Sequence, residues 1–249
     1  MKFHRFIIYL TTWFLVISCQ KETKKTITIA CASNMQFTLK QIVNNKKVAK
    51  KNDFNIILGS SGKLTAQIEA GAPFDIFLSA NAEYPKYLIS KNINYPKAKT
   101  YAYAKLGVFS NTKKNIDLLS FLTSIEVKKI AIPNPKTAPY GKMAKETLKN
   151  MGIYNKIKHK LVYGESVMQS NLFVISGAAD IGFTAISTLN NLKTESNFNF
   201  QKVPDSLYTS IEQQILILNP RTETNEFKNF ILSQKGQSIL KEYGYGSIY

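Results

Sequence analysis

The chain has 249 residues, with 33 Lys and Arg against 16 Asp and Glu, and a formal net charge of +17. Such a balance suggests nucleic acid, but the only arginines are Arg5 and Arg221, and the lysines are scattered, often among asparagines. Because arginine forks dominate the recognition of bases and phosphates, the composition excludes a nucleic-acid partner and favours a solvated lysine surface. That surface still favours the approach of anions or acidic membrane head groups.

The N-terminus has the pattern of a bacterial lipoprotein signal. A basic start precedes an apolar run over 6–17, which ends in Val-Ile-Ser-Cys at Cys19. The pattern predicts a signal peptide over 1–18, a lipid on Cys19 and a polar tether over 19–26. A plain secretory signal cut elsewhere is the alternative. The expected location is extracytoplasmic, with the protein held on the membrane by its lipid anchor.

Cysteine and histidine are too few for much catalytic chemistry. Once Cys19 carries lipid, Cys31 has no disulfide partner, and its place at the end of an apolar strand predicts a small buried side chain. Past residue 18 the sole histidine is His159, in a lysine-rich segment typical of a surface. A Ser-His or Cys-His triad and a His-rich zinc site are therefore disfavoured. We expect no enzyme and no cofactor, with a catalytic Cys31 thiol as the weaker alternative.

Apolar periodicity predicts strands and helices that alternate nearly throughout. Strands are expected over 27–32, 55–58, 75–78, 105–109, 129–133, 160–163, 180–185, 200–203 and 213–218. Helices are expected over 34–45, from about 61 to 70, and over 139–151, 166–176, 223–232 and 238–243. The alternation predicts an α/β protein with mainly parallel sheets, whose ligand lies beyond the carboxyl ends of the strands. The length suits two lobes of roughly a hundred residues each.

The stretch 59–80 (GSSGKLTAQIEAGAPFDIFLSA) places a Ser/Gly turn between a strand and a helix. Ser60 or Ser61 then lies at a helix N-terminus, where unpaired N–H groups and the positive dipole end suit an anion. An ordinary serine N-cap is the alternative interpretation. The glycine spacing excludes a P-loop, and no Gly-x-Ser-x-Gly elbow is present.

Three further predicted helices begin in a similar way. Their starts are Ser33-Asn34, Tyr140-Gly141 and Ser166-Val167. If the four N-termini converge, each supplies roughly half a positive charge, and together they balance about one dianion.

With these motifs the chain resembles the molybdate-binding protein (ModA) family of ABC-transporter solute-binding proteins. The resemblance is carried by IACASNM (29–35), the 59–80 block, IPNPKTAPYGKMAKETL (132–148), KLVYGESV (160–167), ADIGFTA (179–185) and SQKGQSILKEYGY (233–245). It implies a type II periplasmic binding protein fold, in which two α/β lobes are joined by two hinge strands and an oxyanion binds between them. By the same resemblance, one lobe covers 27–104 and 205–249 and the other covers 105–204, with hinges near 101–105 and 200–206.

Carried over by motif, the oxyanion-binding residues are Ser33, Asn34, Ser61, Tyr140 and Val167. Ser33 and Ser61 would donate through hydroxyl and backbone N–H, while Tyr140 and Val167 would donate through backbone N–H. The chain departs from many members in having Tyr140 before Gly141. It also has Ala185 where one branch has a ligand-contacting tyrosine.

The ligand that the resemblance implies is molybdate or tungstate, with molybdenum present only as the bound oxyanion and no protein–metal bond. A site made only of donors suits a dianion that only accepts hydrogen bonds. Phosphate carries a proton that needs an acceptor, and leaving it unpaired costs about 1–3 kcal/mol; Glu165 is the nearest candidate acceptor. The expected partners are the oxyanion, an ABC-transporter permease and the membrane, and the protein is expected to be a monomer. The alternatives are a binder of another oxyanion such as sulfate, an enzyme using Cys31 or a serine, or a lipoprotein that has lost its ligand.

Overall fold

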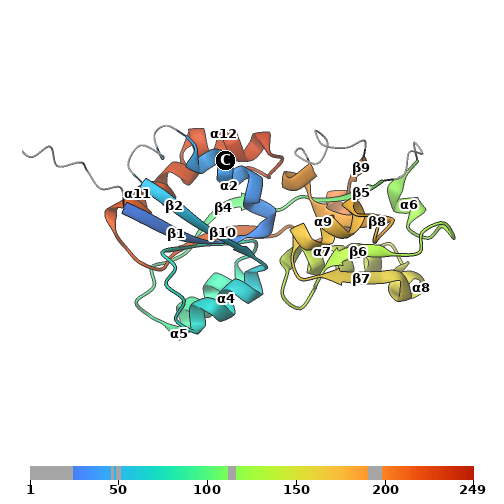
Figure 1. Ribbon diagram of the computed structural model, residues 1–249, viewed down its shortest axis with the longest axis horizontal. Coiled ribbons are helices and arrows are strands. Elements are labelled where there is room, and N and C mark those ends of the chain that lie inside the picture. Colours follow the sequence, from blue (N-terminus) through green and yellow to red (C-terminus); the bar gives the residue numbers. More distant parts are fainter. Residues whose placement is uncertain (1–24, 46–47, 49–51, 112–115, 190–197) are drawn as a thin grey trace, which may run out of the picture.

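The computed structural model describes residues 25–45, 48, 52–111, 116–189 and 198–249. The predicted signal peptide, Cys19 and most of the tether lie outside the described residues. Figure 1 shows two lobes side by side, each built around one sheet and its helices.

The first lobe contains a five-stranded sheet in the order β2-β1-β3-β10-β4. Its strands are β1 (Lys25–Ala32), β2 (Asn52–Gly59), β3 (Ile76–Ser79), β4 (Lys99–Tyr103) and β10 (Glu212–Ile217). Its helices are η2 (Ser33–Met35), α2 (Gln36–Val43), α4 (Ser61–Glu69), α5 (Glu83–Lys91), α11 (Thr222–Leu232) and α12 (Gln234–Glu242). Helices α2, α11 and α12 pack on one face of the sheet and α4 and α5 on the other.

The second lobe repeats this plan with a sheet in the order β7-β6-β8-β5-β9. Its strands are β5 (Leu106–Ser110), β6 (Ile130–Pro133), β7 (Leu161–Gly164), β8 (Ile181–Ala185) and β9 (Asn199–Lys202). Its helices are α6 (Leu118–Phe121), α7 (Pro139–Asn150), α8 (Tyr154–Ile157), η3 (Lys158–Lys160), α9 (Val167–Ile175) and, in the crossover that follows β9, η4 (Asp205–Leu207). Helices α6 and α7 pack on one face and α9 on the other.

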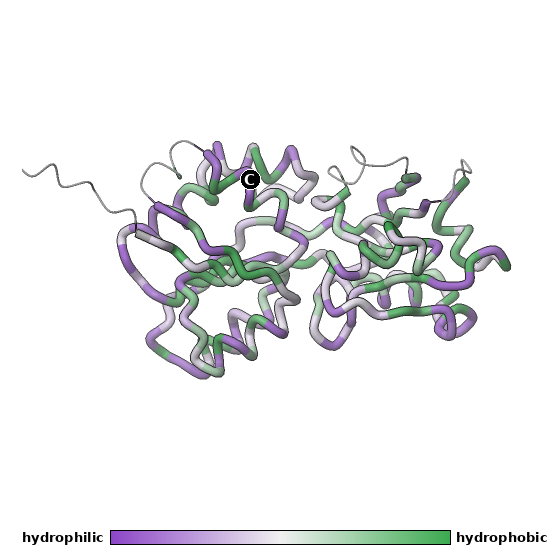
Figure 2. The backbone as a smooth tube through the Cα atoms, viewed as in Figure 1, coloured by the Kyte–Doolittle hydropathy of each residue, from purple (hydrophilic) through white to green (hydrophobic). Residues whose placement is uncertain are grey.

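Successive side chains of a strand point to opposite faces of the sheet, and this alternation gives each sheet a hydrophobic core on both faces. In β1, Ile27, Ile29 and Cys31 are fully buried against one helical layer, and Ala30 is buried against the other. Figure 2 shows the same division, with hydrophobic residues concentrated in the strands and hydrophilic ones in the outer loops. Both faces of each sheet are covered, so the inner strands β3, β5, β6 and β8 are buried at every position.

The prediction of mainly parallel sheets was wrong, because both sheets are mixed. In each, two strand pairs are parallel and two are antiparallel. Strand β10 enters the first sheet from the second lobe and runs antiparallel to both β3 and β4. Local periodicity does not reveal the direction in which a strand returns from another lobe.

Two elements of the first lobe were not predicted from the sequence. Helix α5 contains a proline, and its only buried residues are Pro85 and Leu88, so its apolar stripe is narrow. Strand β4 alternates exposed and buried residues only weakly, and it forms by pairing with β10.

The chain crosses between the lobes twice, after Tyr103 and between β9 and β10. The Lys105 ammonium on the first crossover lies 2.7 Å from the Asp205 carboxylate on the second, and the Tyr208 hydroxyl donates to the same carboxylate at 2.6 Å. Burial alone would raise the pKa of Asp205, but hydrogen bonds from Lys105, Tyr208 and Lys202 outweigh it and lower the pKa to about 2. The two crossovers are thus tied to each other by a charged contact.

Candidate functional site

A small pocket lies where the two lobes meet. It is lined by Ala32, Ser33, Asn34, Gly59, Ser60, Ser61, Ala80, Ala138, Pro139, Tyr140 and Val167. Ala32, Gly59 and Ala80 stand at or just beyond the carboxyl ends of β1, β2 and β3, the edge where ligands bind in α/β sheets. The structure therefore brings together, in one pocket, all five residues that the sequence predicts for the site.

The start of α4 separates the roles of its two serines. The Ser60 hydroxyl accepts a hydrogen bond from the Lys63 N–H at 3.4 Å, and Ser60 is the N-cap. The Ser61 hydroxyl accepts from the Ala80 N–H at 3.0 Å, which leaves its own proton to donate. Ser60 is therefore the ordinary cap, and Ser61, which lines the pocket, keeps a hydroxyl proton that a ligand could accept.

Ser33 and Asn34 open the short η2 helix, which leads directly into α2. Both amide hydrogens of Asn34 are already donated, to the Gln213 Oε1 at 2.9 Å and the Tyr245 hydroxyl at 3.2 Å. The donor that Asn34 retains for a ligand is its backbone N–H, because the first N–H groups of a helix lack intrahelical acceptors. Within the described part of the chain, the Ser33 hydroxyl has no hydrogen-bond partner although Ser33 is only 4% exposed.

The second lobe contributes two helix starts. Helix α7 begins at Pro139, which has no N–H, so Tyr140 presents the first available donor. Helix α9 begins at Val167 behind the cap of Ser166, whose hydroxyl accepts from the Gln169 N–H at 3.3 Å. Ala185 is fully buried in β8 and does not line the pocket.

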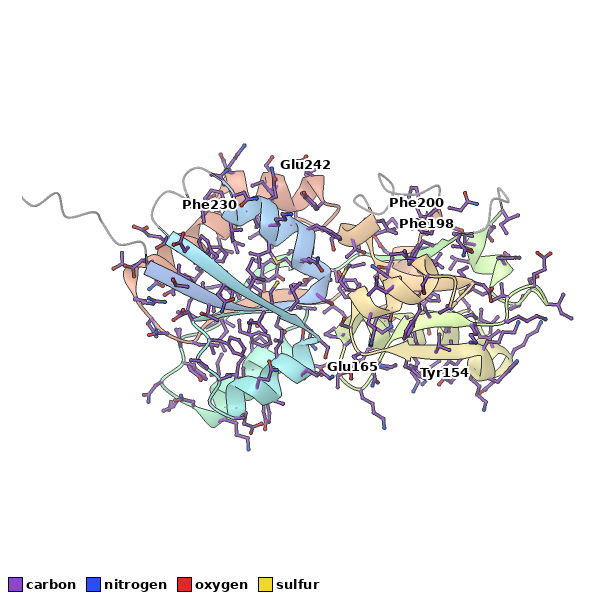
Figure 3. All side chains as sticks on the ribbon, viewed as in Figure 1. Tyr154, Glu165, Phe198, Phe200, Phe230 and Glu242 are labelled. Carbon is purple, nitrogen blue, oxygen red and sulfur yellow. The ribbon has the colours of Figure 1, made fainter. Side chains whose placement is uncertain are left out.

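No carboxylate, ammonium or guanidinium group belongs to the described residues that line the pocket. Glu165 lines a neighbouring groove instead, where it is 62% exposed and pairs with the Lys63 ammonium at 2.5 Å. Figure 3 shows Glu165 at the junction of the two lobes. Burial raises the pKa of the Tyr140 hydroxyl well above its ordinary value, so this group stays neutral and adds no negative charge beside the pocket.

Cys31 is fully buried and its thiol donates to the Ala32 carbonyl at 3.4 Å. Burial strongly raises the pKa of this thiol, which keeps it protonated and a poor nucleophile. His159 is exposed. Among the described residues, no group of three or more His, Cys, Asp or Glu side chains is placed to hold a metal ion, and no helix is long and apolar enough to cross a bilayer.

Several contacts join the lobes around the pocket. The Gly62 N–H of α4 donates to the Thr137 carbonyl at 2.9 Å, and the Tyr84 hydroxyl donates to the same carbonyl at 3.3 Å. The Ser187 hydroxyl, which follows β8, donates to the Asn34 carbonyl at 2.9 Å. These bonds hold the donors of the two lobes on opposite sides of one small pocket.

Sequence reasoning missed the residues behind the pocket. Gln213 and Tyr245 hold the Asn34 amide, yet they lie 179 and 211 residues from it along the chain. One signal was available: Gln213 is the first of two polar residues in the strand predicted over 213–218 (QQILIL), which otherwise is apolar.

The fold and the site define an extracellular solute-binding protein. A family model described as bacterial extracellular solute-binding protein matches residues 27–246. The molybdate-binding protein ModA of Rhodobacter capsulatus is 33% identical over 191 residues, 75% of either chain. A putative ABC-transporter substrate-binding lipoprotein of Bacillus subtilis, YvgL, is 29% identical and covers 98% of both chains. The periplasmic molybdate-binding protein of Azotobacter vinelandii superposes with a TM-score of 0.80 at 29% identity, over 88% of this chain and 98% of that one.

The chain therefore belongs to the molybdate-binding protein (ModA) family of ABC-transporter solute-binding proteins.

Proposed function

We propose that this protein captures molybdate or tungstate between its lobes and presents the oxyanion to a membrane permease, without catalysing a reaction. The observation that carries the proposal is the pocket lining, which offers hydroxyls and helix N-termini from both lobes and no ionised side chain. The proposed contacts are the hydroxyls of Ser33 and Ser61 and the backbone N–H groups of Asn34, Tyr140 and Val167.

The charge of a dianion is balanced here by dipoles. Helices α4, α7 and α9 direct their N-termini at the pocket from two lobes, and η2 adds a fourth start. With roughly half a positive charge at each helix N-terminus, the sum approaches the charge of one dianion. Fixed dipoles also bind an anion without placing a buried lysine in the empty pocket, where it would lose its hydration.

The donor-only lining also supports selectivity against phosphate. The proton of hydrogen phosphate needs an acceptor, and the nearest candidate, Glu165, points its carboxylate to Lys63 in the neighbouring groove. An unpaired buried donor costs about 1–3 kcal/mol, which corresponds to roughly a ten- to hundredfold loss of affinity. Sulfate differs from molybdate mainly in size, so the preference between these two anions is to be determined by comparing their binding.

The remaining elements of the proposal come from the sequence pattern and the family. A signal peptide over 1–18 and a lipid on Cys19 would anchor a monomer on the outer side of the membrane, next to its permease. The proposed lobes cover 27–104 with 205–249, and 105–204, and they close about the two crossovers.

The test is the melting temperature of the soluble chain from Lys21 onward with molybdate, tungstate, sulfate or phosphate. At 100 times its dissociation constant, a ligand stabilises the protein by about 2.7 kcal/mol, which shifts the melting temperature by several degrees. We expect large shifts with molybdate and tungstate and a small one with phosphate. The absence of a shift with every oxyanion would refute the proposal.

A further inference from the structure

A buried polar group outside the pocket connects the proposed ligand contacts of the two lobes. Gln213, on β10, is fully buried. Its Oε1 accepts from the Asn34 amide at 2.9 Å and from the Tyr101 hydroxyl at 2.9 Å, and its Nε2 donates to the Tyr140 hydroxyl at 3.1 Å. One amide therefore contacts the η2 start in the first lobe and the α7 start in the second.

The local backbone is shaped for this placement. Gln213 pairs with Ala102 and Gln214 with Thr100, so Tyr101, which donates to Gln213, is the extra residue of a β-bulge on β4. Bulges redirect side chains and are common beside functional sites. Gln213 does not line the pocket itself, although two of its partners, Asn34 and Tyr140, do.

Loss of the hydrogen bond to Gln213 would carry a free-energy cost for each of its partners. Tyr140 is 1% exposed and Asn34 is 1% exposed, so a lost hydrogen bond would leave a buried polar group without compensation. Burial keeps the hydroxyls of Tyr101 and Tyr140 neutral by raising their pKa values, so both can exchange hydrogen bonds with an amide at any physiological pH. A satisfied buried network of this kind restrains the rotamers of its members.

We propose that Gln213 is a positioning residue that links closure of the lobes to anion binding. It fixes the η2 start against the α7 start, so that the donors of both lobes reach the anion together. The proposal rests on the proposed oxyanion-binding function. It gives Tyr140 two roles: the backbone N–H binds the anion, and the side-chain hydroxyl joins the lobes through Gln213.

The first experiment compares Gln213→Met with Gln214→Met. The two residues are chemically identical neighbours on β10, but the Gln214 amide only donates to the half-buried Thr100 hydroxyl at 3.4 Å. We expect Gln213→Met to weaken molybdate binding about tenfold or more, mainly through faster dissociation. Gln214→Met should stay within about twofold of wild type. Equal effects of the two variants would overturn the proposal.

A double-mutant cycle with Tyr140→Phe separates positioning from general loss of stability. Tyr140→Phe removes only the hydroxyl that accepts from Gln213 and keeps the backbone donor. We expect it to weaken binding about three- to tenfold in the wild type and hardly at all in the Gln213→Met background. Fully additive effects would show that the two side chains act independently and would refute the link. Should Gln213→Met fold poorly, the single variant Tyr140→Phe decides the question, because the proposal requires it to weaken binding and an unchanged affinity would refute it.

A measurement without ligand separates this proposal from the proposed function. Small-angle X-ray scattering should give a larger radius of gyration for Gln213→Met than for wild type and Gln214→Met, because a broken bridge favours separated lobes. If the wild type binds no oxyanion and this difference persists, the bridge stands and the oxyanion function fails. If wild type binds molybdate and Gln213→Met changes neither the radius nor the affinity, Gln213 has no positioning role.

Discussion

Gly62→Ala should separate the stability of the fold from the closure of the lobes. Gly62 lies in the first turn of α4, and alanine is favoured over glycine in a helix by up to about 1 kcal/mol. A Cβ at this position would lie 3.0 Å from the Thr137 carbonyl oxygen and 3.1 Å from the Thr137 Cα, both backbone atoms of the other lobe. The substitution therefore favours the helix and obstructs the contact between the lobes.

The size of the effect follows from the bond that must lengthen. The Gly62 N–H donates to the Thr137 carbonyl at 2.9 Å, and such a bond contributes about 0.5–1.5 kcal/mol. Its loss predicts roughly a two- to tenfold weaker affinity for molybdate. The melting temperature without ligand should change by no more than about 2–4 °C, because the gain in helix propensity of up to about 1 kcal/mol offsets the lost bond.

Calorimetric titration with molybdate and thermal melting without it would measure both quantities. The new Cβ would also lie 2.7 Å from the Tyr84 hydroxyl of the same lobe, so Tyr84→Phe provides the control. Tyr84→Phe also removes the hydrogen bond from Tyr84 to Thr137, so the double variant is compared with Tyr84→Phe alone. If Gly62→Ala weakens binding by the same factor in the Tyr84→Phe background as in the wild type, the contact with Thr137 causes the loss. An unchanged affinity in Gly62→Ala, with the helix intact, would show that the lobes do not close through this contact.

Four further substitutions test the site and the hinge. Ser61→Asp should abolish anion binding in titration, because it places a buried carboxylate against the anion. Ser60→Ala should mainly lower the free energy of unfolding by about 1 kcal/mol, because the helix cap is lost. Equal losses of affinity in the two variants would contradict these roles. Asp205→Asn should lower the free energy of unfolding at pH 7 by about 1 kcal/mol or less, since this carboxylate is half exposed. The folded pKa of Asp205 is depressed to about 2, so this contribution is present above about pH 4 and should vanish in denaturation curves as the pH falls towards 2; a constant difference would refute it. Cys31→Ala should leave the molybdate affinity within about twofold, since the thiol points to a carbonyl and lies outside the pocket lining; lost binding would point to a role for the thiol.

Much of the site was predictable because helix starts are local. The Ser/Gly turn before α4, Pro139 before Tyr140 and Ser166 before Val167 each encode an N-terminus within a few residues. Their recurrence suggested that these starts converge, and the family resemblance supported that hypothesis. The structure places all five predicted residues in the pocket lining, while their contacts with an anion remain a prediction.

The structure also revised how one predicted residue would act. Asn34 attracts attention as a polar side chain beside Ser33, yet both of its amide hydrogens are donated to Gln213 and Tyr245. These partners come from β10 and from the C-terminal segment after α12. No local pattern specifies contacts across so much of the chain.

By itself, then, the sequence determined the two-sided apolar strands, the helix starts and the shortage of catalytic groups, because these depend on neighbours along the chain. The tertiary structure alone decided the mixed direction of the sheets, the separate roles of Ser60 and Ser61, and the burial of Gln213 between two lobes. These features depend on which distant segments meet in space, and that choice is made by packing and hydrogen bonding between them.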